Sequence, residues 1–247
     1  MKSLPALLLV LAACVAPSPD PTEATETILV ASDLDNAPFA YVDEDGAPAG
    51  RDVEMMAMLA EQAGLDLEWR RMPFDALLDA CAAGEVDVVC ATLGITSERA
   101  MRVAFSEPYF TTSIAVVARA GEGEPGSLAD LAGRKVAAGA GTTSEFAVRA
   151  KLTNATGVFE NKEGLDSAAR LADGLVDAVV LDGPAADALV AASDGSLRRL
   201  PEELAVERYA LALPRDRTAL LDALDRGLAE LEDEWAALDA RHGLDGR

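Results

Sequence analysis

A short sequence phrase occurs twice in the chain and limits the folds it can adopt. The phrase GEVDVV at 84–89 is echoed 90 residues later by GLVDAV at 174–179. Each copy follows a helical Ala/Leu segment and ends where a loop begins, as expected for buried strands of a sheet covered on both faces. The pattern favours two related α/β lobes, with chance similarity between βα units as the alternative. In this register Thr92 lies opposite Asp182, at strand ends that face a shared cleft.

The stretch from 73 to 110 contains the first copy and predicts helix, strand, loop and helix. Apolar residues recur at helical spacing up to Gly84, which ends the helix, and a strand follows over 86–91. A new helix begins near Thr96. Because ligands of open α/β sheets bind beyond the carboxyl ends of strands and beside helix N-termini, we expect the loop before Thr96 to form a wall of a binding site.

The rest of the chain alternates between strand and helix patterns. The predicted strands are 28–32, 65–69, 113–118, 136–138, 176–181 and 209–213. The predicted helices are 51–63, 143–151, 165–172, 184–192 and one long helix over 218–241. This alternation indicates an α/β fold with largely parallel sheets. The strands at 113–118 and 209–213 could join two lobes, with the last helix packed on the first.

Composition excludes several classes of function. The 247 residues include 43 acidic and 21 basic side chains, a net charge of −22, which argues against binding to nucleic acid or to an anionic membrane surface. His242, the one histidine, lies near the C-terminus, so a Ser-His-Asp triad, a Cys-His pair or a histidine metal site is not expected. No cofactor or metal is predicted.

The N-terminus has the pattern of an export signal. Residues 1–13 combine a basic start with an apolar run too short to span a bilayer. Leu11 to Cys14 is similar to the bacterial lipoprotein signal, in which the cysteine is acylated after cleavage. An ordinary signal peptide, or a retained apolar N-terminus, is the alternative. Residues 14–26 are rich in Pro, Thr and Glu, which is typical of a tether between membrane and domain.

Three features could hold a small charged ligand. Arg99 lies in the first turn of the helix at Thr96, where a cation opposes the helix dipole by roughly 0.3–1 kcal/mol, and an anionic ligand would reverse that cost. The alternative is a solvated arginine paired with Glu98 or Glu107. The loop 139–144 offers free N–H groups and hydroxyls for an anion, but lacks the lysine of a phosphate loop. Asp182 is an acid at a strand end, or simply the N-cap of the next helix.

Together these features match the head group of an α-amino acid. Arg99 and the 139–144 loop, with Thr142 and Thr143, would take the carboxylate, and Asp182 would take the ammonium.

Short motifs in a fixed order identify the chain as similar to a known family. They are APF at 37–39, GRDVE at 50–54, FDAL at 74–77, GEVD at 84–87, ITSER at 95–99, FSEPY at 105–109, LADLAG at 128–133, GTTS at 141–144 and VDAV at 176–179. The sequence resembles the family 3 extracellular solute-binding proteins, the polar-amino-acid receptors of ABC importers, from Ile28 to the end. The resemblance implies a two-lobe periplasmic-binding-protein-like (Venus flytrap) fold, with 27–112 plus 210–247 as lobe 1 and 113–209 as lobe 2.

The resemblance also implies roles for individual residues. Arg99 would hold the α-carboxylate, helped by Thr142 and by backbone near Thr92 and Gly94, and Asp182 would take the α-ammonium. Phe74 would lie beside the ligand and Asp33 would select its side chain. The remaining predicted ligand-binding residues are Asn36, Phe39 and Thr143.

Three positions depart from the family pattern. Asn36 stands where many members stack an aromatic ring on the ligand, Gly94 replaces the usual Ser or Thr, and Gly139 replaces a Lys or Gln. These departures loosen the pocket or alter its specificity. Asp33 and Asp35 near the mouth favour a cationic or neutral polar side chain over an acidic one.

The expected function is that of a lipid-anchored receptor in the periplasm or at the cell surface. It would be a monomer without enzyme activity that delivers an amino acid to the membrane subunits of an ABC importer. One alternative is a dehydratase acting on prephenate or arogenate, with Asp33 or Asp182 as general acid. Another is a free-standing sensor subunit. Cys81 and Cys90 are expected to be buried thiols, because helix and strand geometry place them too far apart to bridge.

Overall fold

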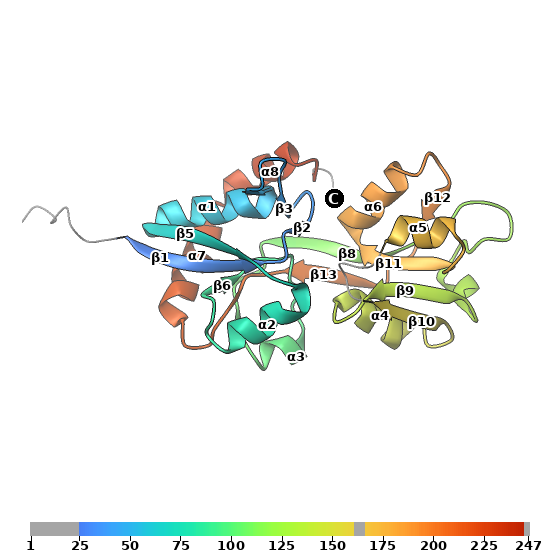
Figure 1. Cartoon of the computed structure of the whole chain (residues 1–247), viewed down its shortest axis with the longest axis horizontal. Coiled ribbons are helices and arrows are strands. Elements are labelled where there is room, and N and C mark those ends of the chain that lie inside the picture. Colours follow the sequence, from blue (N-terminus) through green and yellow to red (C-terminus); the bar gives the residue numbers. More distant parts are fainter. Residues whose placement is uncertain (1–24, 161–165, 245–247) are drawn as a thin grey trace, which may run out of the picture.

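The computed structural model describes residues 25–160 and 166–244, which form a two-lobe α/β molecule. Two groups of helices and strands lie side by side along the long axis, and the strands β8 and β13 run between them (Figure 1). The predicted signal peptide, the lipidation site Cys14 and nearly all of the tether lie outside the described residues. Within them, no helix has both the length and the apolarity to cross a membrane.

The first lobe is built on a five-stranded sheet, of order β5-β1-β6-β14-β7. Its strands are β1 (Glu26–Ser32), β5 (Leu65–Arg71), β6 (Val88–Val89), β7 (Ala104–Phe105) and β14 (Ala212–Leu213). Its helices are α1 (Arg51–Ala63), α2 (Phe74–Ala82), α3 (Ser97–Ala100), α7 (Thr218–Glu230) and α8 (Glu232–Arg241). A small sheet of β2 (Asp35–Asn36), β3 (Ala40–Val42) and β4 (Pro48–Ala49) lies beside it.

The second lobe is built on a six-stranded sheet. Its strands are β8 (Phe110–Arg119), β9 (Lys135–Gly139), β10 (Thr156–Glu160), β11 (Ala178–Asp182), β12 (Leu197–Arg199) and β13 (Ala205–Tyr209). Its helices are the 3₁₀ turn η1 (Leu128–Leu131), α4 (Thr143–Lys151), α5 (Ser167–Ala172) and α6 (Gly183–Ala191). β9 pairs in parallel with β10 and β11, whereas β8 is antiparallel to β11, β12 and β13.

The two copies of the repeated phrase occupy matching places. One contributes β6 to the first sheet and the other contributes β11 to the second. The aspartate of each copy has the same role: Asp87 Oδ2 accepts a hydrogen bond from the Leu29 N–H at 2.9 Å, and Asp177 Oδ2 accepts one from the Lys135 N–H at 2.8 Å. Each carboxylate thus satisfies a backbone donor of the neighbouring strand.

Removal of either aspartate should destabilise its lobe. We expect Asp87→Ala and Asp177→Ala each to lower the free energy of unfolding by about 1.5 kcal/mol, because a strand N–H loses a charged acceptor. Urea unfolding of each variant measures this. Asp79→Ala is the matched control, since its side chain is 74 % exposed and pairs only with Arg102 in the described residues. Equal losses in all three variants would contradict the assignment.

The strand predicted at 209–213 is wrong in its limits. β13 ends at Tyr209, and β14 begins at Ala212. The chain changes partner between them: Tyr209 pairs with Phe110 of the crossing strand, whereas Ala212 pairs with Val89 and Phe105 of the first sheet. The second connection between the lobes is therefore 205–209.

The long helix predicted over 218–241 is also wrong, because it breaks at Leu231 into α7 and α8. The break redirects α8 across the end of α1. There the Trp235 indole N–H donates to the Leu228 carbonyl at 2.9 Å, and the Arg51 Nε–H donates to Asp239 Oδ1 at 2.8 Å. Apolar residues recur at helical spacing through both helices, so the hydrophobic periodicity alone does not show that the helix breaks at Leu231.

A buried ion pair lies where α1 meets the start of β8. The side chains of Arg51 and Asp52 are both 0 % exposed, 3.3 Å apart, and the Tyr109 hydroxyl donates to Asp52 Oδ2 at 2.7 Å. The guanidinium also lies 5.3 Å from the Tyr109 ring and 5.9 Å from the Trp235 ring. Burial raises the pKa of Asp52, and Arg51 opposes that shift. The pair joins α1, α8 and the crossing strand.

Cys81 and Cys90 are buried free thiols, which confirms the expectation that they are not bridged. Burial raises the pKa of Cys81 to about 12.

Candidate functional site

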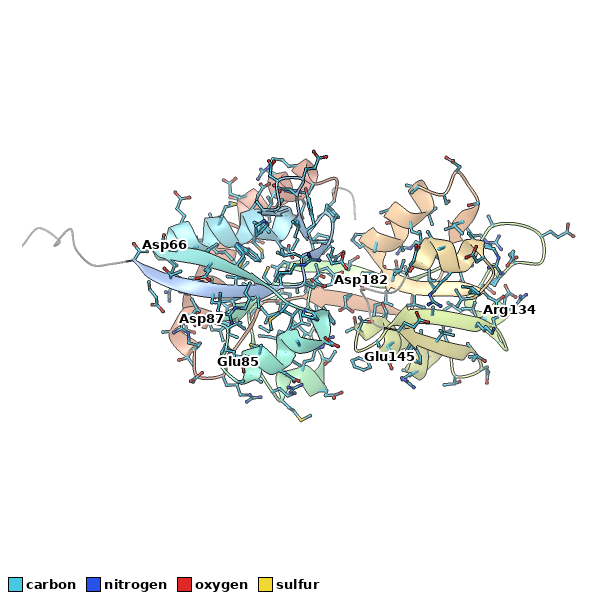
Figure 2. All side chains as sticks on the ribbon, viewed as in Figure 1. Asp66, Glu85, Asp87, Arg134, Glu145 and Asp182 are labelled. Atoms are coloured by element: carbon cyan, nitrogen blue, oxygen red, sulfur yellow. The ribbon has the colours of Figure 1, made fainter. Side chains whose placement is uncertain are left out.

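A cavity of about 420 Å³ lies between the two lobes. Figure 2 shows Asp182 in the middle of the molecule, where the two groups of elements meet. The lining residues are Asp35, Asn36, Phe74, Thr92, Gly94, Arg99, Gly139, Thr142, Thr143, Ser144, Asp166, Ser167, Val180, Leu181, Asp182 and Ala185. Eight of the ten predicted ligand-binding residues are therefore brought to one cavity, from both lobes.

Arg99 is oriented by backbone carbonyls of both lobes. Thr96 caps α3 by accepting the Arg99 N–H, which fixes the first turn. The side chain is 6 % exposed, so it is not the solvated arginine of the alternative. Nη1 donates to the Gly94 carbonyl at 2.7 Å and Nη2 donates across the cleft to the Gly141 carbonyl at 3.0 Å. A guanidinium carries five N–H donors, so these two bonds leave it able to bind an anion.

Acidic residues around Arg99 offset the cost of burying its charge. Burial lowers the pKa of Arg99 from its usual value, while Glu207 and Asp182 oppose this shift. Its guanidinium carbon lies 5.8 Å from the centre of the Phe74 ring. Phe74 therefore shares one side of the cavity with the arginine.

The N-terminus of α4 faces Arg99 from the second lobe. Thr142 is the N-cap residue, and its hydroxyl donates to the Gly139 carbonyl at 2.7 Å. The Thr143 hydroxyl donates to Glu207 Oε1 at 3.0 Å. Since the N–H groups of a helix start favour negative charge, this end of the cavity suits a carboxylate.

Asp182 also lines the cavity from the second lobe. It ends β11 and occupies the N-cap position of α6, but its side chain makes no capping hydrogen bond there. Instead, Asp182 Oδ2 accepts a hydrogen bond from the Tyr209 hydroxyl at 2.6 Å. Tyr209 thus holds the carboxylate at the cavity wall.

Thr92 and Asn36 are joined at the rim of the first lobe. The Asn36 amide donates to the Thr92 hydroxyl at 2.8 Å. Thr92 has φ of 47°, a left-handed conformation that is unusual for a β-branched residue and common at functional sites.

Two predicted site residues do not line the cavity. Phe39 is buried in the core, with its ring edge-on to Phe110 at 5.0 Å and to Tyr209 at 5.6 Å, because an aromatic ring there fills the space under the crossing strands. Asp33 is also buried, and its carbonyl accepts a hydrogen bond from the Arg71 Nε–H. The side-chain selector implied for Asp33 is therefore not at the wall of the cavity.

Sequence reasoning missed Glu207 and the start of α5. Glu207 lies on β13, is 4 % exposed, and burial, followed by the like charge of Asp182, raises its pKa to about 7. The limits predicted for that strand left Glu207 outside it, so its burial went unnoticed. Asp166 and Ser167 also line the cavity, where Asp166 caps α5 by accepting the Ala169 N–H at 2.9 Å.

Comparison with curated proteins gives relatives that bind amino acids. One is the L-cystine-binding protein TcyJ of Escherichia coli (strain K12), 29% identical over 212 residues, which cover 84% of this chain and 78% of the relative.

Solved structures with the same fold also include amino-acid-binding proteins. An ancestral arginine-binding protein bound to glutamine superposes with a TM-score of 0.80 at 29% identity, covering 90% of this chain and 100% of the other. Holo ArgBP from T. maritima superposes with a TM-score of 0.75 at 33% identity, covering 87% of this chain and 95% of the other.

The family model described as bacterial extracellular solute-binding proteins, family 3, matches residues 28–244. That match spans most of the chain, both lobes and every residue that lines the cavity. The protein therefore belongs to the family 3 bacterial extracellular solute-binding proteins.

Proposed function

We propose that this protein is the substrate-binding component of an ABC importer and that it binds an amino acid between its lobes. The observation that carries the proposal is the pairing of Arg99 with Asp182 in one cavity, each held in place by neighbouring residues. A zwitterionic amino acid carries a carboxylate that can bind Arg99 and an ammonium that can bind Asp182. The similarity to an L-cystine-binding protein and to an ancestral arginine-binding protein bound to glutamine supports an amino acid as the ligand.

In this proposal the carboxylate lies against Arg99 and the N-terminus of α4, with Thr142 and Thr143 and the backbone of Thr92 and Gly94 nearby. The ammonium lies against Asp182.

The side-chain end of the ligand would face a mainly acidic part of the cavity. Asp35 and Asp166 line it, and Phe74 offers an apolar face. Many family members stack an aromatic ring on the ligand at the position of Asn36. Here the Asn36 amide instead donates a hydrogen bond to Thr92. We therefore expect neutral polar or cationic side chains to bind better than acidic ones, since a second carboxylate would be repelled.

Ligand binding would stabilise a closed arrangement of the lobes. We propose that 27–112 plus 210–247 and 113–209 move as two bodies about β8 and β13. A ligand that contacts both bodies favours the closed arrangement, by the difference between its binding free energies to the closed and the open arrangement. The same proposal includes export, acylation of Cys14, anchoring of a monomer at a bacterial membrane, and docking to importer membrane subunits.

A thermal-shift screen against the common amino acids tests the proposal. A ligand at 100-fold its Kd adds about 2.7 kcal/mol to the free energy of unfolding. For a chain of this size that corresponds to roughly 2–4 °C in Tm for each kcal/mol. We expect a large shift with at least one neutral or cationic amino acid.

Matched analogues decide how the ligand is held. The amide and the deaminated analogue of the best amino acid each remove one charge of the head group, and we expect both to lose the shift. Shifts with neither amino acids nor their analogues would refute the proposal. Conversion of prephenate by the purified protein would instead support the dehydratase alternative.

A further inference from the structure

Glu207 does not line the cavity, yet it contacts Thr143 and lies at the junction of the lobes. It is on β13, close to the point where the chain passes from one lobe to the other. The Ile95 N–H donates to the Arg208 carbonyl at 3.1 Å, and the Ala210 N–H donates to the Leu93 carbonyl at 3.2 Å. The other edge of β13 pairs with β8 throughout, and Glu207 itself lies opposite Thr112.

The carboxyl of Glu207 is covered from both lobes. On the first lobe, Gly94 approaches so closely that a Cβ added to it would lie 1.6 Å from Glu207 Oε1. On the second lobe, the Thr143 hydroxyl donates to the same oxygen at 3.0 Å. A side chain at 94 would displace the Glu207 carboxyl from this position, so the glycine that departs from the family pattern makes room for the carboxyl.

Four groups face Glu207 from the surrounding elements. Asp182 on β11 is a like charge, Arg99 on α3 is an opposite charge, Thr143 on α4 is a neutral donor, and Tyr209 lies on the same face of β13. Burial, and next the charge of Asp182, raise the pKa of Glu207 to about 7, while Thr143 and Arg99 act in the opposite sense. An ionised carboxylate is therefore disfavoured where Gly94 and Thr143 shut out water.

We propose that Glu207 is a positioning residue of the ligand site: its neutral carboxyl allows Gly94 and Thr143 to close around it, and its ionisation favours separation of the lobes. The inference rests on the proposed hinge at β8 and β13. It does not depend on which ligand binds.

The direction of the pH effect follows from the two arrangements. When the lobes separate, water reaches Glu207 and its pKa falls toward the ordinary value of 4.5, whereas in the arrangement described here it is about 7. The closed arrangement binds the proton more tightly, so low pH favours closure. Between these two values the ratio of closed to open protein should fall by up to about tenfold per pH unit.

Small-angle X-ray scattering of the ligand-free protein from about pH 5 to about pH 8 tests this. We expect the radius of gyration to rise with pH in the native protein. Glu207→Gln should keep the low-pH radius throughout, because a neutral amide of the same shape cannot ionise. Glu202→Gln, an exposed neighbour in sequence, is the control and should follow the native profile.

A second variant separates this role from a merely structural one. Thr143→Val removes the hydroxyl that lowers the pKa of Glu207, so the rise in radius should begin at higher pH. A native radius that does not change with pH, or a Glu207→Gln profile equal to the native one, overturns the proposal. Because no ligand is added, that result leaves the amino-acid screen as an independent test of the proposed function.

Discussion

Arg99→Ala is expected to weaken binding of the preferred amino acid by roughly 30-fold to several thousand-fold. Truncation of one partner of a buried, hydrogen-bonded charge pair costs about 2–5 kcal/mol, and each 1.4 kcal/mol is a factor of ten in affinity. The bond from Arg99 to the Gly94 carbonyl of the same lobe orients the guanidinium without help from the second lobe. Isothermal titration of the native protein and the variant measures the loss.

Two further variants give this experiment its controls. Arg99→Lys keeps the charge but loses the planar fork of donors, so it should bind better than Arg99→Ala and worse than the native protein. Arg102→Ala removes a nearby, more exposed arginine paired with Asp79 and should leave affinity unchanged. The assignment of Arg99 fails if Arg99→Ala folds normally and binds the amino acid as tightly as the native protein does.

Arg51→Met should have the largest effect on stability, a loss of about 3–5 kcal/mol in the free energy of unfolding, because it leaves Asp52 buried without its counter-ion. Asp52 then accepts a proton in the folded protein more readily than in the unfolded chain. The folded state of the variant gains relative stability as pH falls, so the deficit against the native protein should shrink toward acid pH. Urea unfolding across pH measures both effects.

The double variant Arg51→Met, Asp52→Asn distinguishes loss of charge balance from loss of packing. Its neutral amide can still accept the Tyr109 hydroxyl, so part of the lost stability should return. Arg102→Ala serves again as the exposed control, with an expected change of less than about 1 kcal/mol. If Arg51→Met alone were as stable as that control, the buried pair would not be what joins α1 to α8.

The elements that the sequence predicted best are those with local end signals. Helix α1 runs from Arg51 to Ala63 as predicted, because Gly64 adopts the left-handed conformation that ends it. The elements predicted worst depend on partners far along the chain. Tyr209 and Ala212 pair with strands of different sheets, and α8 turns toward Arg51. The local sequence pattern predicts neither arrangement.

The candidate site divides in the same way. Arg99, Thr142 and Asp182 were found because each lies where a strand ends or a helix begins, which sequence patterns mark well. Glu207 was missed because its burial is created only when the loop at Gly94 and the start of α4 come together over β13. Phe39 shows the opposite error, since a motif placed it near the ligand while packing took it into the core.

Tyr209 has a consequence for anyone who would transplant this binding site. Its ring stacks on Phe110 at 5.8 Å where the strands cross, while its hydroxyl steadies Asp182. One residue thus packs where the strands cross and also positions Asp182, to which we assign the ligand ammonium in the proposed function. A biosensor made by grafting the cavity residues alone onto another scaffold would leave that acceptor unsupported, so the crossing strands must be carried over with the site.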